Sequence, residues 1–363
     1  MRIVYIITSL GMGGAERQVV ALAERMAARG HTVAVIVLRP QLQEEWPAGI
    51  DVVRLGMRRT PLSVLNGLLR GRRFLKDFKP DLVHSHGFHA SFVARLLKIM
   101  RPATVVLSTV HNSGEAGWRR MLAYRFTDGL SRRTTAVCEM AAERYVRLKA
   151  VPQRKCMVVT NGIDLEEFQR DSARRMRMRA GMEVKDEFIW LAVGRNVPEK
   201  DFPNLLAAFV QVRKALPQTQ LWIAGERQGE SVGGAGNLEE TGVRWFGLRR
   251  DMAALYDGAD GFVLSSRSEG MPLAVAEAMA MEKPVVATDV GGVSELLGDA
   301  GVLVAAEDPD ALATAMIGVM QRTQEERFAM GREARRRVEA NFSMDAKADE
   351  WEGVYRVVVK KRA

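Results

Sequence analysis

The stretch GFVLSSRSEGMPLAVAEAMA, residues 261–280, combines a strand, a turn and the start of a helix. Gly261–Leu264 is a short apolar run of the kind that forms a buried strand, and the polar residues after it supply a glycine-containing turn. Pro272 stands near a first helical position, where its missing N–H is not needed. Glu269 and Glu277 are the two carboxylates of the stretch. The pattern predicts acidic side chains where a strand ends and a helix begins.

The same rhythm of apolar run, turn and amphipathic helix occurs along the whole chain, in two series. Strands that alternate with helices imply parallel sheets covered on both faces. The highly charged stretch Asp171–Asp186 has no strand pattern, and we expect it to connect two domains. The expected strands are Ile3–Ser9, Thr32–Leu38, Val52–Leu55, Leu82–Ser85, Thr104–Thr109, Thr134–Val137 and Met157–Thr160, then Phe188–Val193, Leu221–Ala224, Val243–Phe246, Gly261–Leu264, Val285–Thr288 and Val302–Val304.

The length of 363 residues suits two domains of ordinary size. We therefore predict an α/β protein of two Rossmann-like, doubly wound parallel-sheet domains, spanning residues 1–168 and 169–342. Ser343 is a candidate N-cap for a last helix that ends near Lys360. In open parallel sheets ligands bind at the carboxyl ends of the strands, so the expected site lies in a cleft between the two domains.

Composition restricts the class of the protein and its expected cellular location. Hydrophobic residues make up 47% and charged residues 27%, as in globular proteins, and no apolar run in the sequence approaches the ~18 residues of a membrane span. Cys138 and Cys156 are too few for a disulfide framework, so we expect a reducing cytoplasmic location.

The net charge of +9 favours anionic partners. A solvated basic face and a face that contacts anionic membrane both explain the cations, and an amphipathic surface for lipid is suggested by the leucines and phenylalanines among them. These cations are concentrated before residue 150, especially at Arg54, Arg58, Arg59, Arg70, Arg72, Arg73, Lys76 and Lys79.

A glycine-rich turn, Gly11–Glu16, follows the first expected strand. Its exposed N–H groups at a helix start favour an anion, and glycines needed only for tight strand–helix packing are the alternative. The turn half-resembles a dinucleotide fingerprint, but Arg39 rather than an acidic residue follows the second strand. An NADP-dependent enzyme that uses Arg39 for a 2′-phosphate is therefore an alternative.

Two further groups of residues stand at expected strand ends. Four of the five histidines are His84, His86, His89 and His111, and no carboxylate or cysteine joins them at metal-ligand spacing. We expect His111 to donate a hydrogen bond to substrate. In the second series Arg195 and Lys200 follow a strand, and two such cations neutralise a diphosphate leaving group without a metal; ordinary surface cations are the alternative.

Taken in order, these motifs resemble the retaining GT-B glycosyltransferases of family four, whose E-x7-E motif matches Glu269 and Glu277. Four more motifs of that family stand in register over nearly the whole chain: Gly13-Gly14-Ala15-Glu16, Asn161-Gly162-Ile163-Asp164, Gly194-Arg195 with Lys200, and Gly291-Gly292-Val293-Ser294-Glu295.

The resemblance implies a role for each matching residue. Arg195 and Lys200 would hold the donor diphosphate, Glu269 the transferred sugar and Glu277 the ribose. Donor contacts are also implied for Gly14, Leu248, Gly270, Met271, Pro272 and Leu273, and acceptor contacts for Gly13, Glu16, His86 and His111. Catalytic roles fall to His111, Arg195, Lys200 and Glu269, and the last helix, about residues 343–363, would cross back to the first domain.

The expected reaction moves a hexose or N-acetylhexosamine from a nucleotide sugar, UDP before GDP, to a glycan or lipid-linked acceptor at the inner face of the cell membrane. We expect a front-face mechanism in which the leaving diphosphate deprotonates the acceptor, with no metal and no cofactor. Asp308-Pro309-Asp310 reads as a helix N-cap rather than a metal motif. The remaining alternative is a non-catalytic polyanion-binding protein, although no nucleic-acid motif supports a nucleic-acid partner.

Overall fold

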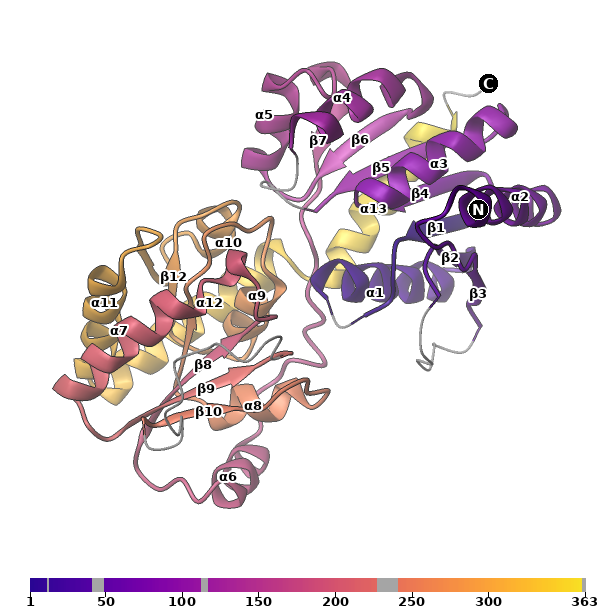
Figure 1. The fold of residues 1–363 in the computed structure, drawn as a ribbon. Coiled ribbons are helices and arrows are strands. Elements are labelled where there is room, and N and C mark those ends of the chain that lie inside the picture. Colours follow the sequence, from indigo (N-terminus) through magenta and orange to yellow (C-terminus); the bar gives the residue numbers. More distant parts are fainter. Residues whose placement is uncertain (12, 41–48, 112–116, 227–240, 361–363) are drawn as a thin grey trace. The chain divides into compact units, whose positions relative to one another are not determined.

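The computed structural model describes residues 1–11, 13–40, 49–111, 117–226 and 241–360. The chain forms two compact units, of which unit 1 comprises Met1–Gly162 with Met344–Ala363 and unit 2 comprises Ile163–Ser343 (Figure 1). The first boundary lies at Gly162 rather than at residue 168, because Phe168 is buried in unit 2, edge-on to Tyr256 at a ring-centroid distance of 5.9 Å.

Unit 1 is built on a parallel sheet of seven strands in the order β3-β2-β1-β4-β5-β6-β7. The order reverses between β1 and β4, which pair from Ile3 with Leu82 to Ile7 with His86. This switch point places the ends of β1 and β4 side by side. The strands are β1 (Arg2–Ile7), β2 (Thr32–Val37), β3 (Asp51–Arg54), β4 (Leu82–His86), β5 (Val106–Val110), β6 (Arg133–Ala136) and β7 (Cys156–Val158).

Helices cover both faces of this sheet because β1 buries alternate residues on opposite sides. Tyr5 and its odd-numbered neighbours pack with α1 and α13, whereas Val4 and Ile6 pack with α2 and α3. The C-terminal helix, shown in yellow in Figure 1, therefore belongs to the core of unit 1. The helices are α1 (Gly14–Ala28), α2 (Pro61–Phe78), α3 (Phe88–Met100), α4 (Trp118–Thr127), α5 (Glu139–Arg147) and α13 (Met344–Lys360).

Unit 2 has a parallel sheet of six strands in the order β10-β9-β8-β11-β12-β13, which reverses between β8 and β11. Its strands are β8 (Phe188–Val193), β9 (Thr219–Ala224), β10 (Val243–Trp245), β11 (Gly261–Leu264), β12 (Val285–Thr288) and β13 (Val302–Val304). Its helices are α6 (Ser172–Gly181), α7 (Phe202–Ala215), α8 (Met252–Gly258), α9 (Leu273–Ala280), α10 (Val293–Leu297), α11 (Pro309–Gln321) and α12 (Gln324–Asn341).

The charged stretch Asp171–Asp186 is not the expected interdomain connection. Asp171 caps α6, its carboxylate accepting from the backbone N–H groups of Ala173 and Arg174. The basic side chains of α6 then pair with acidic ones of unit 2, as in Arg175 with Asp260 at 2.6 Å. The charges that suggested a solvated linker thus fasten this helix to α8 and the residues that follow it.

The thirteen expected strands all form, with ends that differ by at most two residues. Asp308 caps α11 by accepting from the N–H of Ala311, and Pro309 is the first helical residue, as the sequence predicted. In the part of the chain that the structure describes, no helix combines the length and the apolar character that a bilayer crossing requires.

Candidate functional site

The switch point of unit 2 brings together the segments after β8 and β11. The first runs from Gly194 to Lys200 and the second from Ser265 to Gly270. In each, a buried apolar strand gives way to glycine and polar residues, so the backbone leaves the sheet at the edge where ligands bind in such folds. Two of the four charged side chains predicted to bind the donor, Lys200 and Glu269, lie in direct contact there.

The Lys200–Glu269 ion pair is the centre of the candidate donor site. The ammonium Nζ of Lys200 lies 2.6 Å from Oε1 of Glu269, and the two side chains are only 22% and 10% exposed. The hydroxyl of Ser266 donates to the same carboxylate oxygen, also at 2.6 Å. Because both charges are largely removed from water, each holds the other in place and the ammonium stays available as a fixed positive charge.

Backbone contacts fix the geometry of the turn that carries Glu269. Ser265 Oγ donates to the carbonyl of Lys200 at 2.9 Å, and Thr288 Oγ1 donates to the carbonyl of Ser266 at 2.7 Å. Gly291 has φ +60°, and a Cβ there would overlap the carbonyl oxygen of Glu269. The glycines after β12 therefore allow that segment to lie directly against the turn.

Glu277 lies on α9 and is separated from Glu269 by the change from turn to helix. Because α9 begins only at Leu273, Glu269 lies in the turn before the helix and only Glu277 belongs to the helix itself. Glu277 is buried, and its Oε2 accepts a hydrogen bond from the Tyr256 hydroxyl at 2.9 Å. Met271, Pro272 and Leu273, predicted to line the donor, are buried between the two glutamates along the chain.

Two other predicted donor-binding side chains are exposed at the same edge of unit 2. Arg195 follows β8, and Leu248, which is 55% exposed, follows β10. Gly247 before it has φ +66°, and its carbonyl accepts from the N–H of Gly225 at the end of β9 at 2.8 Å. The ends of β8, β10 and β11 in unit 2 thus carry a guanidinium, an apolar side chain and the lysine–glutamate pair.

In unit 1 the glycine-rich turn leads directly into α1. Gly13 is the N-cap and the exposed Gly14 is the first helical residue. A Cβ on Gly13 would collide with the carboxylate of Glu16. Ser9 also donates to Glu16 at 3.4 Å, so this acidic side chain folds back over the turn that opens the helix. Met12 lies outside the described residues.

His84, His86 and His111, which we call the histidine row, lie at the ends of β4 and β5. The rings of His84 and His86 are 4.1 Å apart and those of His86 and His111 are 5.2 Å apart. Burial lowers the pKa of His111 to about 4 and the pKa values of the other two well below their usual range. All three imidazoles are therefore neutral at pH 7.

Sequence reasoning missed the residues that support these side chains. Tyr256 holds Glu277, and Tyr355 of α13 contacts His84 at 2.8 Å, across 271 positions of the chain. No local pattern marks either tyrosine, because each partner comes from a distant element. The sequence analysis also gave Ser266 no role, although its spacing of three residues from Glu269 suits a turn contact.

Comparisons with known proteins give matches over both units. Residues 12–167 match a family model described as Glycosyltransferase Family 4, and residues 187–322 match one described as Glycosyl transferases group 1. The D-inositol 3-phosphate glycosyltransferase of Segniliparus rotundus is 30% identical over 316 residues, which is 81% of this chain and 70% of that protein.

Two further similarities concern proteins whose names state a nucleotide. The UDP-Gal:alpha-D-GlcNAc-diphosphoundecaprenol alpha-1,3-galactosyltransferase of Escherichia coli is 24% identical over 273 residues, 70% of each chain. The crystal structure of Anabaena HepE in complex with UDP-glucose has a TM-score of 0.83 at 18% identity, and the match covers 98% of this chain and 100% of that chain. At this sequence identity, the match to HepE shows similarity of fold alone.

Proposed function

Because the chain belongs to glycosyltransferase family 4 and has the GT-B fold, we propose that this glycosyltransferase moves a hexose or N-acetylhexosamine from a UDP-sugar, in preference to a GDP-sugar, with retention at the anomeric carbon. The observation that carries the proposal is the Lys200–Glu269 pair at the switch point of unit 2. The names of the E. coli relative and of the HepE complex support UDP as the nucleotide. Family membership sets aside the NADP-dependent and polyanion-binding alternatives.

We assign the donor diphosphate to the two cations of unit 2. Lys200 is held as a largely desolvated point charge, and Arg195 extends from the neighbouring strand end with its planar guanidinium exposed. Charge develops on the leaving diphosphate in the transition state, and cations fixed in advance stabilise it most there. Glu269 would then contact the transferred sugar and Glu277 the ribose.

Retention follows from a front-face displacement in this proposal. A double-displacement mechanism needs two carboxyl groups about 5–5.5 Å apart, and Glu269 is instead engaged by Lys200 and Ser266. The departing diphosphate would accept the acceptor proton on the same face of the sugar. The two cations would balance the diphosphate charge, so the proposed reaction requires no metal and no cofactor.

The donor assignment is tested by a thermal-shift panel of UDP, GDP and ADP and of their sugars with the full chain. A ligand present at about 100 times its Kd stabilises the folded state by about 2.7 kcal/mol. We expect stabilisation by UDP and by at least one UDP-sugar, unchanged by chelator. Stabilisation by NADPH alone, or by DNA alone in a salt-sensitive manner, would overturn the proposal.

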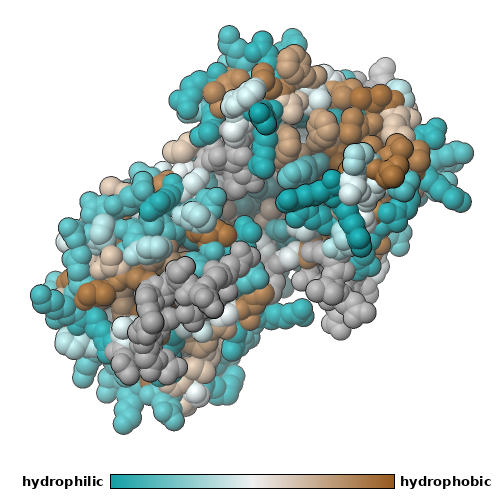
Figure 2. Space-filling view, viewed as in Figure 1, coloured by the Kyte–Doolittle hydropathy of each residue, from teal (hydrophilic) through white to brown (hydrophobic). Residues whose placement is uncertain are grey.

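For the acceptor we propose a lipid-linked glycan presented at an anionic membrane. The name of the E. coli relative contains a diphosphoundecaprenol acceptor. In unit 1, α2, α3 and α4 all begin at the carboxyl edge of the sheet, and exposed apolar side chains stand near each start: Leu62 is 75%, Phe92 39% and Trp118 69% exposed. Figure 2 shows hydrophobic surface in brown beside hydrophilic surface in teal over α2 and α3.

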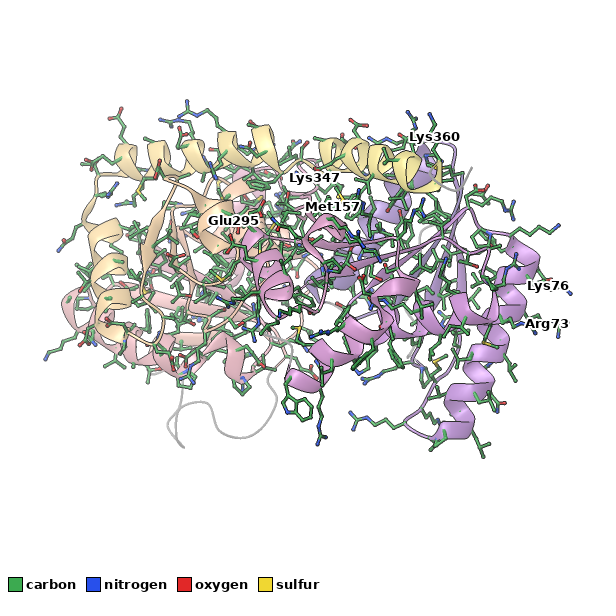
Figure 3. The ribbon with its side chains drawn as sticks, turned by 90° about the horizontal axis from the view of Figure 1, so that it is seen from above. Arg73, Lys76, Met157, Glu295, Lys347 and Lys360 are labelled. Atoms are coloured by element: carbon green, nitrogen blue, oxygen red, sulfur yellow. The ribbon has the colours of Figure 1, made fainter. Side chains whose placement is uncertain are left out.

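Positively charged side chains accompany the exposed Leu62, Phe92 and Trp118, which we call the apolar rim. Arg58 and Arg59 precede α2 and are exposed, and Arg119 is exposed beside Trp118. Arg73 and Lys76 project outward from α2 nearer its C-terminal end (Figure 3), about three to four turns away from Leu62. Apolar side chains flanked by arginines bind the interface of anionic lipid through burial and through charge together. The same rim lies next to the histidine row, where the acceptor is proposed to react.

Vesicle binding tests this membrane surface. We expect the full chain to co-sediment with vesicles of phosphatidylglycerol and phosphatidylcholine at low salt, and Leu62→Ser/Trp118→Ser to bind at least about tenfold less, since burying each side chain contributes about 1.5–3 kcal/mol. Val210→Ser is the matched control, because Val210 is 67% exposed on α7 of unit 2. Equal sedimentation of the double variant, or none of the native chain, would refute the surface.

A further inference from the structure

The histidine row is held at one end by a chain of hydroxyl groups that contact His84. Thr135 Oγ1 lies 3.4 Å from the carbonyl of Ser108, to which it can only donate, so we assign the hydrogen of the short 2.6 Å contact between Thr135 and Thr109 to Thr109. Thr109 Oγ1, 2.7 Å from His84 Nε2, is then left to accept. His84 therefore carries its hydrogen on Nε2, and its Nδ1 accepts from the Tyr355 hydroxyl at 2.8 Å.

His86, two residues further along β4, has different partners. Its Nδ1 lies 3.0 Å from Nε2 of His111. Its other ring nitrogen, Nε2, is buried and has no hydrogen-bond partner among the described residues. His86 as a whole is 3% exposed.

Two arrangements of one hydrogen would satisfy the His86–His111 contact. If His111 donated from Nε2, neutral His86 would carry its own hydrogen on the buried Nε2, which would be an N–H group without an acceptor. If His86 donates from Nδ1, its Nε2 is a bare lone pair, and His111 carries its hydrogen on Nδ1. Buried N–H groups without partners are rarer in proteins than under-used acceptors, so the second arrangement is favoured.

We propose that His86 is a positioning residue that donates from Nδ1 to His111 Nε2, so that His111 presents Nδ1–H, and no free lone pair, to the substrate. The identity of that substrate as the transferred sugar or its acceptor rests on the proposed function; the tautomer does not. With Nε2 occupied and Nδ1 protonated, neutral His111 donates a hydrogen bond and does not serve as a general base. This division of roles agrees with a leaving diphosphate that takes the acceptor proton.

The tautomers are measured by NMR of the full chain with ¹⁵N-labelled histidine at pH 7.5. A protonated ring nitrogen and an unprotonated one have well-separated shifts, and the chain has only five histidines, so single His→Gln variants at His31 and His89 assign the two signals outside the row. We expect Nδ1–H for His86 and His111, and Nε2–H for His84 in the same spectrum. Nε2–H at His111, or imidazolium at either residue, would overturn the proposal.

A matched pair of variants tests the positioning role. In His86→Asn the amide nitrogen stands near the former Nδ1 and donates to His111, whereas in His86→Asp a carboxylate of the same shape only accepts. We expect His86→Asn to keep kcat within several-fold of the native enzyme. His86→Asp should lose about 10² in kcat, as for loss of one transition-state donor. The Kd for UDP, which is assigned to unit 2, should not change in either variant.

The two measurements separate the possible failures. The NMR result stands or falls even if the chain transfers no sugar, so loss of the proposed function and loss of the tautomer assignment are distinguishable. Equal kcat values for His86→Asn and His86→Asp, with both proteins folded and the expected tautomers present in the native chain, would show that His86 does not position His111 for the reaction.

Discussion

Replacing Lys200 by methionine keeps most of the side-chain volume and removes one charge of the central ion pair. Glu269 would then keep its contact with Ser266 and lose its cation, while its side chain remains only 10% exposed. Breaking a fully buried pair in this way costs about 3–5 kcal/mol, and an exposed pair is worth about 0–1 kcal/mol. We expect a loss of about 2–3 kcal/mol in the stability of unit 2, nearer to the buried limit.

For a domain of this size such a loss lowers Tm by roughly 4–12 °C. Transfer activity should fall by about 10²–10³ in kcat, because a preorganised donor to the leaving diphosphate is gone. Two controls separate the effects. Lys200→Met/Glu269→Gln should recover stability but not activity, since no uncompensated charge remains. Arg195→Ala should lose activity by a similar factor and stay within about 0.5 kcal/mol of the native stability, because Arg195 is exposed.

The measurements are scanning calorimetry of the purified variants and initial rates with saturating donor. Near-normal transfer by folded Lys200→Met or Arg195→Ala would refute the assignment of the diphosphate to these cations. An unchanged Tm for Lys200→Met would show that the pair does not hold the turn. If the double variant lost stability as well as activity, Lys200 would support activity only by stabilising the fold and not by contacting the diphosphate.

Other predictions follow from single contacts. Tyr256→Phe removes the donor to the buried Glu277, so we expect nucleotide binding weakened by about tenfold with kcat nearly unchanged, whereas an unaltered Kd for UDP would contradict a role for Glu277. Gly291→Ala forces a Cβ against the turn of Glu269 at φ +60°, and should cost more than about 1 kcal/mol of stability together with most of the activity; a folded, fully active variant would contradict this. Asp308→Ala removes the cap of α11 and should cost about 1 kcal/mol in urea unfolding with full activity retained, and loss of activity would instead point to a metal or substrate role. The histidine row stays neutral in the native state and is protonated in the unfolded state below the ordinary pKa of 6.5, so stability is fully present above that pH and should fall as pH decreases toward about 4, by about 1.4 kcal/mol per pH unit for each histidine; a Tm that is level between pH 7 and 5 would contradict it.

The sequence predicted the sheets well because buried parallel strands are nearly continuous apolar runs, as in Phe188–Val193, whose limits agree with the structure. The charged α6 was misread as a linker because its acidic partners, such as Asp260, lie far along the chain. Single-sequence patterns reveal strand ends, and so they located Lys200 and Glu269. They do not reveal which distant side chains meet at those ends.

The histidines show the same limit within unit 1. Alternation along β4 placed His84 and His86 on one face, and the structure has their rings 4.1 Å apart. Their different partners depend on Tyr355 of the last helix and on His111 of the next strand, which only the folded chain brings together. The sequence pattern therefore grouped the histidines correctly. It could not distinguish the structural contacts of His84 from the positioning role proposed for His86.

The central claim is that the strand ends of unit 2 bind a nucleotide diphosphate through the cations after β8. Titration calorimetry of UDP, GDP and ADP against the native chain and Arg195→Ala tests it most directly. We predict that at least UDP binds the native chain and that Arg195→Ala binds it at least about tenfold more weakly, since charged contacts of this kind contribute about 1.5–3 kcal/mol. Equal affinity in both proteins, or no binding of any of the three nucleotides to the native chain, would contradict the account.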